Sequence, residues 1–169
     1  MAIKDGMIME LKHEGENTRK MLERVPYEKA TYKPHEKSRA LANEAFHIAN
    51  ITPWISRIIA TDGMDVSVPG AFPKTELPKS SEELLALFDK NHAEALKHLE
   101  GATDEAFMTP WTFRNADHVI FTLPRVAAIR NLGLNHIYHH RGQLSVYLRL
   151  LGVPVPGMYG PSADEENKQ

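Results

Sequence analysis

The spacing of apolar residues along the chain predicts four helices. The first runs from about Met7 to Val25, ends before Pro26, and carries its apolar positions at heptad-like intervals on one face. That face consists of Ile8, Leu11, Gly15, Thr18, Leu22 and Val25. Because its middle is small, at Gly15 and Thr18, we expect the face to leave room there.

The same periodicity, together with capping residues, predicts three further helices. They span approximately Arg39–Ile59, Ser80–Glu100 and Pro124–Leu151. Pro53 lies inside the second of these and should kink the helix or restart it. The connecting stretches read as long loops, and residues 102–123, with Trp111 and Phe113, read as irregular, with no convincing strand pattern. Four helices and long inter-helix connections indicate an all-α, four-helix bundle.

Length and composition fit a single domain. The chain has 169 residues, of which 42% are hydrophobic and 25% charged, so residues 1–169 are enough for one well-packed core. The acidic tail from about residue 162 is expected to be flexible. The net charge of −2 implies no strongly basic face, so we expect no nucleic-acid partner. No apolar run is long enough to cross a bilayer, and the first residues, MAIKDGMIME, lack the pattern of a signal peptide. These features predict no membrane association and a cytoplasmic protein.

Cysteine is absent and histidine is abundant, which limits the available chemistry. There are nine histidines and no cysteine, so disulfides, thiolate ligands and a cysteine nucleophile are excluded. A metal site would have to use imidazole with carboxylate, water or an incoming ligand. That ligand set suits zinc, nickel, iron or copper better than calcium or magnesium.

Three of the histidines fall within the stretch LNHIYHHRGQ of the fourth predicted helix. At about 100° per residue, His140 lies about 40° from His136, whereas His139 lies about 60° away on the other side, at the edge of the buried face. Gln143 and Tyr147 extend the same polar stripe. Two histidines four residues apart have the spacing to bind one metal ion, and the alternative is a hydrogen-bonded or surface pair. The metal interpretation gains weight because the pair lies on an apolar face and no Asp or Glu of that helix can satisfy it.

A third ligand must come from another helix, and His47 is the best candidate. It lies in the mostly apolar stretch NEAFHIANI, near the edge of a buried face, and Glu44 one turn earlier could orient it by a hydrogen bond. The alternative is a hydrogen-bonded histidine at the edge of the core. The other histidines are expected off the core face, among solvated residues or in loops: His13, His35, His92, His98 and His118.

A di-iron carboxylate site is a competing interpretation. Both Glu10-x-x-His13 and Glu44-x-x-His47 match the Glu-x-x-His element of such bundles. That site also needs core-facing carboxylates on the remaining helices, and the fourth predicted helix has none. His13 also points away from the core, so the three-histidine site is favoured.

Two neighbours of the histidine cluster carry smaller expectations. Arg141 is expected off the core face, in a salt bridge rather than on a substrate. Gly142 is expected to permit the close approach of a neighbouring helix or of the tail.

The segments around these histidines resemble the DinB/YfiT-like family. The resemblance lies in LANEAFHIAN around His47, in PHEKSR before it, and above all in HIYHHRGQLSVYLRLLGVPVPGMYGPSADE, which begins at His136. It implies a four-helix bundle of the family's own topology, usually a homodimer, with zinc or nickel held by His47, His136 and His140. Members include thiol-dependent enzymes, which use glutathione, mycothiol or bacillithiol in S-transfer or maleylpyruvate isomerisation.

We therefore expect a metal-dependent enzyme that activates water or an external low-molecular-weight thiol against a small-molecule substrate, as a hydrolase or an S-transferase. Glu44, Gln143 and Tyr147 are the nearest polar candidates for positioning or proton transfer, and the alternative for each is a hydrogen bond within the core. A non-catalytic metal-binding or stress-associated bundle is the second interpretation. The substrate, the thiol and the metal stay open at this point.

Overall fold

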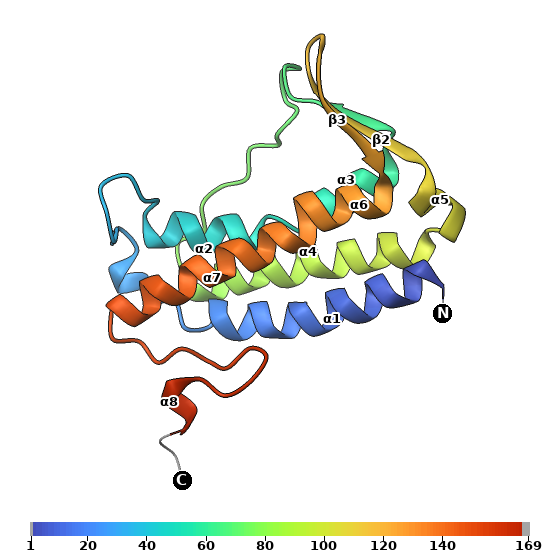
Figure 1. Cartoon of the computed structure of the whole chain (residues 1–169). Coiled ribbons are helices and arrows are strands. Elements are labelled where there is room, and N and C mark those ends of the chain that lie inside the picture. Colours follow the sequence, from blue (N-terminus) through green and yellow to red (C-terminus); the bar gives the residue numbers. More distant parts are fainter. Residues whose placement is uncertain (1, 167–169) are drawn as a thin grey trace.

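The computed structural model describes residues 2–166 and is mainly helical (Figure 1). The bundle consists of α1 (Ile3–Leu22), α2 (Leu41–Ala49) with α3 (Pro53–Ala60), α4 (Ser81–Gly101), and the continuous run of α6 (Arg125–Ile129), the π-helical η2 (Arg130–Leu134) and α7 (Asn135–Leu150). Three short helices complete it: η1 (Tyr27–Lys29), α5 (Asp104–Met108) and α8 (Ala163–Glu166). The predicted four-helix bundle is confirmed. Within the described residues, no helix is long and apolar enough to span a bilayer.

Pro53 restarts the second helix, as its position predicted. It occupies the first turn of α3, where a missing backbone N–H costs nothing. The carbonyl of Ala49 at the end of α2 is satisfied from outside, since the Asn91 side chain of α4 donates to it at 2.9 Å. The second predicted helix is therefore divided into α2 and α3, and the Asn91 side chain of α4 caps the end of α2 at the break.

A small sheet replaces the irregular region predicted for residues 102–123, and that prediction is wrong. Strands β1 (Gly63–Asp65), β2 (Pro110–Asn115) and β3 (His118–Pro124) pair in the order β1-β2-β3, the first pair parallel and the second antiparallel. The β2–β3 hairpin projects from the end of the bundle at which α3 and α6 meet (Figure 1).

The hairpin turn lacks the residues that usually announce one. Asn115 pairs with His118, so the loop is Ala116–Asp117, and Ala116 adopts a φ of 50° where Asn or Gly is the usual choice. The turn is held from outside, because Asp65 Oδ1 accepts a hydrogen bond from the Ala116 N–H at 3.0 Å. A distant carboxylate thus substitutes for local turn chemistry, and sequence periodicity cannot show this.

The core divides into two clusters along the bundle. One joins the first half of α1 to α3, the sheet and α6, and has the fully buried Trp111 at its centre. The other joins the second half of α1 to α2, the start of α4 and α7, around Leu41, Ile48 and Leu148. Helices α2 and α7 therefore face each other over a length that includes all the candidate metal ligands.

The small middle of the α1 face does leave room, and the ring of His92 from α4 fills it. A Cβ atom at Gly15 would collide with the imidazole of His92. This ring stacks on Phe88 with centroids 5.5 Å apart, and burial lowers the pKa of His92 below its ordinary value. The expectation that His92 is solvated is therefore wrong, because the space beside a glycine admits a flat ring.

Gly15→Ala should destabilise the protein, whereas Gly6→Ala in the same helix should not. Overpacking costs about 1–3 kcal/mol and outweighs a gain of about 1 kcal/mol in helix propensity. Nothing lies within 4 Å of a Cβ at Gly6, so only the gain applies there. Free energies of unfolding in urea would measure the difference, and equal effects at the two positions would contradict the packing argument.

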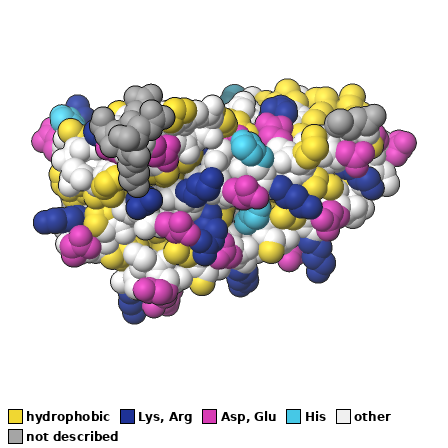
Figure 2. Space-filling view, turned by 90° about the horizontal axis from the view of Figure 1, so that it is seen from below, with side chains coloured by type: hydrophobic (Ala, Val, Ile, Leu, Met, Phe, Trp, Pro, Cys, Tyr) yellow, Lys and Arg dark blue, Asp and Glu magenta, His cyan; other side chains and the backbone are white. Residues whose placement is uncertain are grey.

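The C-terminal segment folds back along the bundle. Asp164 of α8 accepts a hydrogen bond from the Val155 N–H at 2.9 Å and pairs with Arg149 of α7 at 2.6 Å. Residues 162–166 of the tail that was expected to be flexible thus include α8, and residues 167–169 lie outside the described residues. On the face shown in Figure 2, basic and acidic side chains are interspersed, so this face carries no patch of one charge.

Arg141 lies inside the bundle, contrary to expectation. It is 3% exposed and pairs at 2.6 Å with Glu14, which is also buried. The predicted salt bridge is therefore confirmed, and the predicted position off the core face is wrong. Tyr159 of the C-terminal segment donates to the same carboxylate at 2.9 Å. Nothing lies within 4 Å of a Cβ at Gly142, so the expected close approach at that glycine is also wrong.

Candidate metal centre

Three imidazoles from two facing helices converge between α2 and α7. His47 comes from α2, and His136 and His140 come from successive turns of α7. One ring nitrogen of each lies within 4.8 Å of the others, and the Nε2 atoms of His47 and His136 are 3.1 Å apart. The ring centroids of His47 and His140 are 4.3 Å apart. The structure thus brings together the three histidines that the sequence singled out.

The π-helical segment η2 directly precedes this pair on α7. A π-helical turn inserts an extra residue and shifts the phase of the positions on either side of it. His136 and His140 both follow the segment, so their relative phase is that of a regular helix. The backbone of Leu132 within η2 also hydrogen-bonds with the ring of His136, which counteracts part of the lowering of its pKa. The irregularity therefore supports one of the three rings.

The spacing of the nitrogens fits a divalent ion. Imidazole nitrogens bound at about 2.0–2.1 Å to one tetrahedral zinc lie about 3.4 Å from each other. The 3.1 Å separation between His47 and His136 is close to this value, and a ring nitrogen of His140 lies within 4.8 Å of both. Three neutral imidazole donors suit zinc, copper, iron or nickel. The cluster could therefore hold a metal ion.

Glu44 orients His140, and not His47 as the sequence suggested. Its Oε1 lies 2.6 Å from Nδ1 of His140, and the carboxylate is almost fully buried. With its proton on Nδ1, the ring donates to Glu44 and turns the lone pair of Nε2 toward the other two histidines. Carboxylate–histidine pairs of this kind are usual beside metal ions. Glu44 faces α7 across the interface, so its partner lies on the opposite helix.

Burial and neighbouring positive charge keep His47 neutral. Desolvation is the largest cause, followed by Arg39 and the two other histidines, and together they lower the pKa of His47 to about 3. The pKa of His136 is lowered in the same direction, again mainly by burial. A neutral imidazole is the ligand form, so both rings are ready to bind metal at neutral pH.

The metal-free protein should lose stability as the pH falls below about 6.5, the ordinary pKa of histidine. Between that pH and about 3, the unfolded chain protonates position 47 while the folded chain does not, so the unfolded state is favoured. His47→Gln should flatten this dependence, and His118→Gln, at an exposed position of β3, should not. Urea titrations from pH 7.5 to 4.5 measure this, and identical slopes for the two variants would contradict it.

Two open hollows flank the cluster, and Arg39 lines both. One, of about 430 Å³, reaches His47, and the other, of about 500 Å³, reaches His140 and Glu44. Lys33 lines the first hollow and Lys37 the second, so the rim is positively charged. These three cations lie in or beside a loop, so helical periodicity carries no signal for them. The PHEKSR motif contains two of them, Lys37 and Arg39, and was the available signal.

Tyr147 and Gln143 both line the second hollow, in different ways. The Tyr147 hydroxyl donates to the carbonyl of Arg39 at 3.1 Å, and burial raises the pKa of this phenol. Gln143 is exposed, so its predicted place on the buried face is wrong, and its amide nitrogen lies 2.9 Å from His139 Nε2. His139 is exposed at the helix edge, as predicted.

The residues of the di-iron alternative do not assemble. Glu10 pairs with Arg130 and accepts a hydrogen bond from the Tyr138 hydroxyl at 2.9 Å. His13 is exposed on α1, as expected. Of the four residues in the two Glu-x-x-His elements, only Glu44 and His47 lie at the interface between α2 and α7. Among the described residues, the candidate metal cluster consists of the three imidazoles of His47, His136 and His140.

The fold and the site together define a helical-bundle protein with a candidate three-histidine metal centre. The chain belongs to the DinB family, whose sequence profile matches residues 4–169. A DinB-like protein from Bacillus cereus ATCC 10987 is similar in structure, with a TM-score of 0.71 and 25% identity over 94% of this chain and 98% of that one. The DinB-like protein YjoA from Bacillus subtilis has a TM-score of 0.70 and 19% identity over 90% of this chain and 97% of that one, a likeness of fold alone.

A sequence relative adds a partial match. The uncharacterized protein YrdA of Bacillus subtilis (strain 168) is 32% identical over 81 residues, which are 43% of this chain and 46% of that protein. The match therefore spans less than half of YrdA. Family membership and the helical fold are established.

Proposed function

We propose that this protein is a metal-dependent enzyme whose metal ion is held by His47, His136 and His140. The observation that carries the proposal is the convergence of three imidazoles, with one nitrogen each within 4.8 Å of the others, beside two open hollows. Zinc or nickel is the proposed ion. When bound, the ion would supply Lewis acidity that lowers the pKa of water or of a thiol. The chain has no cysteine, so a thiol nucleophile would come from a low-molecular-weight co-substrate.

The remaining residues would orient ligands and substrate. Glu44 fixes the tautomer of His140, which keeps Nε2 available as a ligand. Tyr147 anchors the backbone of Arg39 and so supports the loop that bears the rim cations. Gln143 is exposed at the second hollow, where it can contact substrate. The reaction would be hydrolysis or thiol-dependent transfer.

The rim favours a small substrate that carries negative charge. Lys33, Lys37 and Arg39 line the two hollows. The one carboxylate among the lining residues, Glu44, lies 2.6 Å from His140 and 3.7 Å from Arg39, so the two lysines leave the rim with excess positive charge. Positive charge around an open site attracts anions and raises their local concentration.

We also propose a homodimer, as the family resemblance implies. The exposed Val146 and Leu150, one turn apart on α7, offer an apolar surface for it.

Metal analysis of matched histidine variants tests the proposal. Wild type purified under metal-replete conditions should carry one zinc or nickel ion per chain. His140→Ala should lose this ion, whereas His139→Ala, at the preceding position of the same helix, should keep it. Turnover of a panel of electrophiles, with water or with each of several thiols, should require the ion. If wild type purified under metal-replete conditions contains no metal, the proposed metal site is refuted. If it contains metal but turns over none of the substrates, the proposed enzymatic function is refuted.

A non-catalytic metal centre is the second candidate, and the placement of the ligands on two helices supports it. His47 and His140 come from helices far apart in sequence, so a bound ion would cross-link α2 to α7 and stabilise the folded state. The melting temperature of His140→Ala distinguishes the two. A variant that loses the ion and keeps its melting temperature excludes a mainly structural metal.

A further inference from the structure

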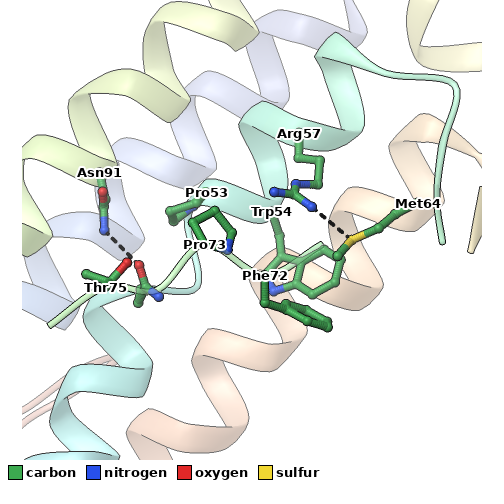
Figure 3. A pocket seen from close by; sticks show the side chains of 9 residues that line it. Pro53, Trp54, Arg57, Met64, Phe72, Pro73, Thr75 and Asn91 are labelled. Atoms are coloured by element: carbon green, nitrogen blue, oxygen red, sulfur yellow. Dashed lines mark hydrogen bonds between the residues drawn. The ribbon is translucent and has the colours of Figure 1, made fainter. Parts of the chain in front are cut away.

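A further cavity, separate from the two hollows beside the histidine cluster, lies between α3 and the loop that follows β1. Its volume is about 230 Å³, and it shares no lining residue with the histidine cluster or with the two hollows beside it. Trp54 and Phe72 form aromatic walls with centroids 5.9 Å apart, and the guanidinium of Arg57 lies directly beside them (Figure 3). Asn50 adds a polar group to the lining, and its side-chain oxygen accepts a hydrogen bond from the Asn91 side chain at 3.4 Å.

Arg57 is the unusual member of this set. Its Nη1 donates to the carbonyl of Ala71 at 2.5 Å and lies 3.2 Å from the sulfur of Met64. Both contacts use one nitrogen, and among the described residues no carboxylate pairs with this guanidinium. The other arginines with little exposure differ, since Arg125 pairs with Asp62 at 2.7 Å and Arg141 pairs with Glu14 at 2.6 Å.

We propose that this cavity binds a small organic carboxylate that carries a single aromatic or compact apolar group. The planar guanidinium presents paired donors that match a carboxylate, and its Nε and Nη2 have no partner among the described residues. The apolar group packs against the ring surfaces that Trp54 and Phe72, in contact with each other, present to the cavity. The volume is below the roughly 300–1,000 Å³ of pockets for drug-sized ligands, so the ligand has about one ring.

Benzoate is a suitable probe, and benzamide is its neutral counterpart of nearly the same shape. Titration calorimetry uses chelator-treated protein, because a carboxylate would otherwise bind a metal ion at the histidine cluster. Benzoate should bind at least about tenfold more tightly than benzamide, as expected for a hydrogen bond to a charged group. Equal affinities, or no benzoate binding, would overturn the proposal.

Variants locate the binding. Arg57→Met should weaken benzoate binding about tenfold or more and leave benzamide unchanged. Arg24→Met removes the same charge from an exposed position at the end of α1 and should have no effect. Phe72→Ala alters a side chain that is 56% exposed, so folding should persist, and both probes should bind less tightly. If Arg57→Met proves unstable, the Phe72→Ala result and the benzoate-to-benzamide ratio decide.

Two results would place the ligand elsewhere. Benzoate affinity that survives both Arg57→Met and Phe72→Ala would exclude the cavity. Affinity that is lost in His140→Ala but retained in Arg57→Met would assign benzoate to the histidine cluster. Neither result bears on whether the cluster binds metal, so this proposal can fail while the proposed function stands.

Discussion

Replacing Glu44 by Gln should lower the affinity for zinc by about ten- to a hundredfold without unfolding the protein. The side chain keeps its size and an acceptor oxygen for Nδ1 of His140, so the packing between α2 and α7 is preserved. What is lost is the negative charge 2.6 Å from that ring, which makes Nε2 a stronger donor to a cation. The carboxylate is 1% exposed, so water cannot replace it.

Competition with a chromophoric chelator measures this effect. His139→Ala is the matched control, since His139 lies next to His140 but is exposed and hydrogen-bonded to Gln143. Its zinc affinity should equal that of wild type. A Glu44→Gln variant that binds zinc as tightly as wild type would show that the carboxylate supports the fold and not the site. A loss at His139 would instead show that the ligand set includes the neighbouring ring.

The histidine cluster could be predicted because the part of α7 that bears His136 and His140 is a regular α-helix. His136 and His140 both follow η2, so the phase of an ideal helix applied to them. The same calculation placed Gln143 on the buried face and failed, because the width of a buried stripe depends on the neighbouring helix. It also paired Glu44 with His47. Phase along one helix shows which side a residue faces but not which side chain meets it from the opposite helix.

Elements held by distant contacts escaped the sequence analysis. The β2–β3 hairpin turns at Ala116, and Asp65 accepts a hydrogen bond from the backbone N–H of that residue. A hairpin turn with Asn or Gly at this position would not need such a contact. Arg141 was expected off the core face, because its helical phase places it about 140° from His136. Its partner, Glu14, lies on the first helix. In each case the deciding residue is far away in the chain, and no short window contains both.

Arg141→Met should destabilise the protein by about 3–5 kcal/mol, because it leaves the buried carboxylate of Glu14 without its countercharge. Glu14 is 6% exposed and Arg141 is 3% exposed, so solvent cannot compensate either charge. The guanidinium also donates to the hydroxyl of Thr18 at 3.2 Å, which adds to the loss. Arg19→Met is the control, since its pair with Asp89 is about half exposed and should contribute less than about 1 kcal/mol.

The double variant Glu14→Gln/Arg141→Met separates the ion pair from the packing around it. Removing both charges avoids an isolated buried charge, so the double variant should be more stable than the sum of the single losses predicts, by about 1–3 kcal/mol. Urea unfolding of all four proteins measures this coupling. The hydroxyl of Tyr159, which donates to Glu14, keeps a hydrogen bond to the glutamine oxygen and limits the cost. Additive losses would mean that the two charges act independently, and the pair would then not be what joins α1 to α7 at this point.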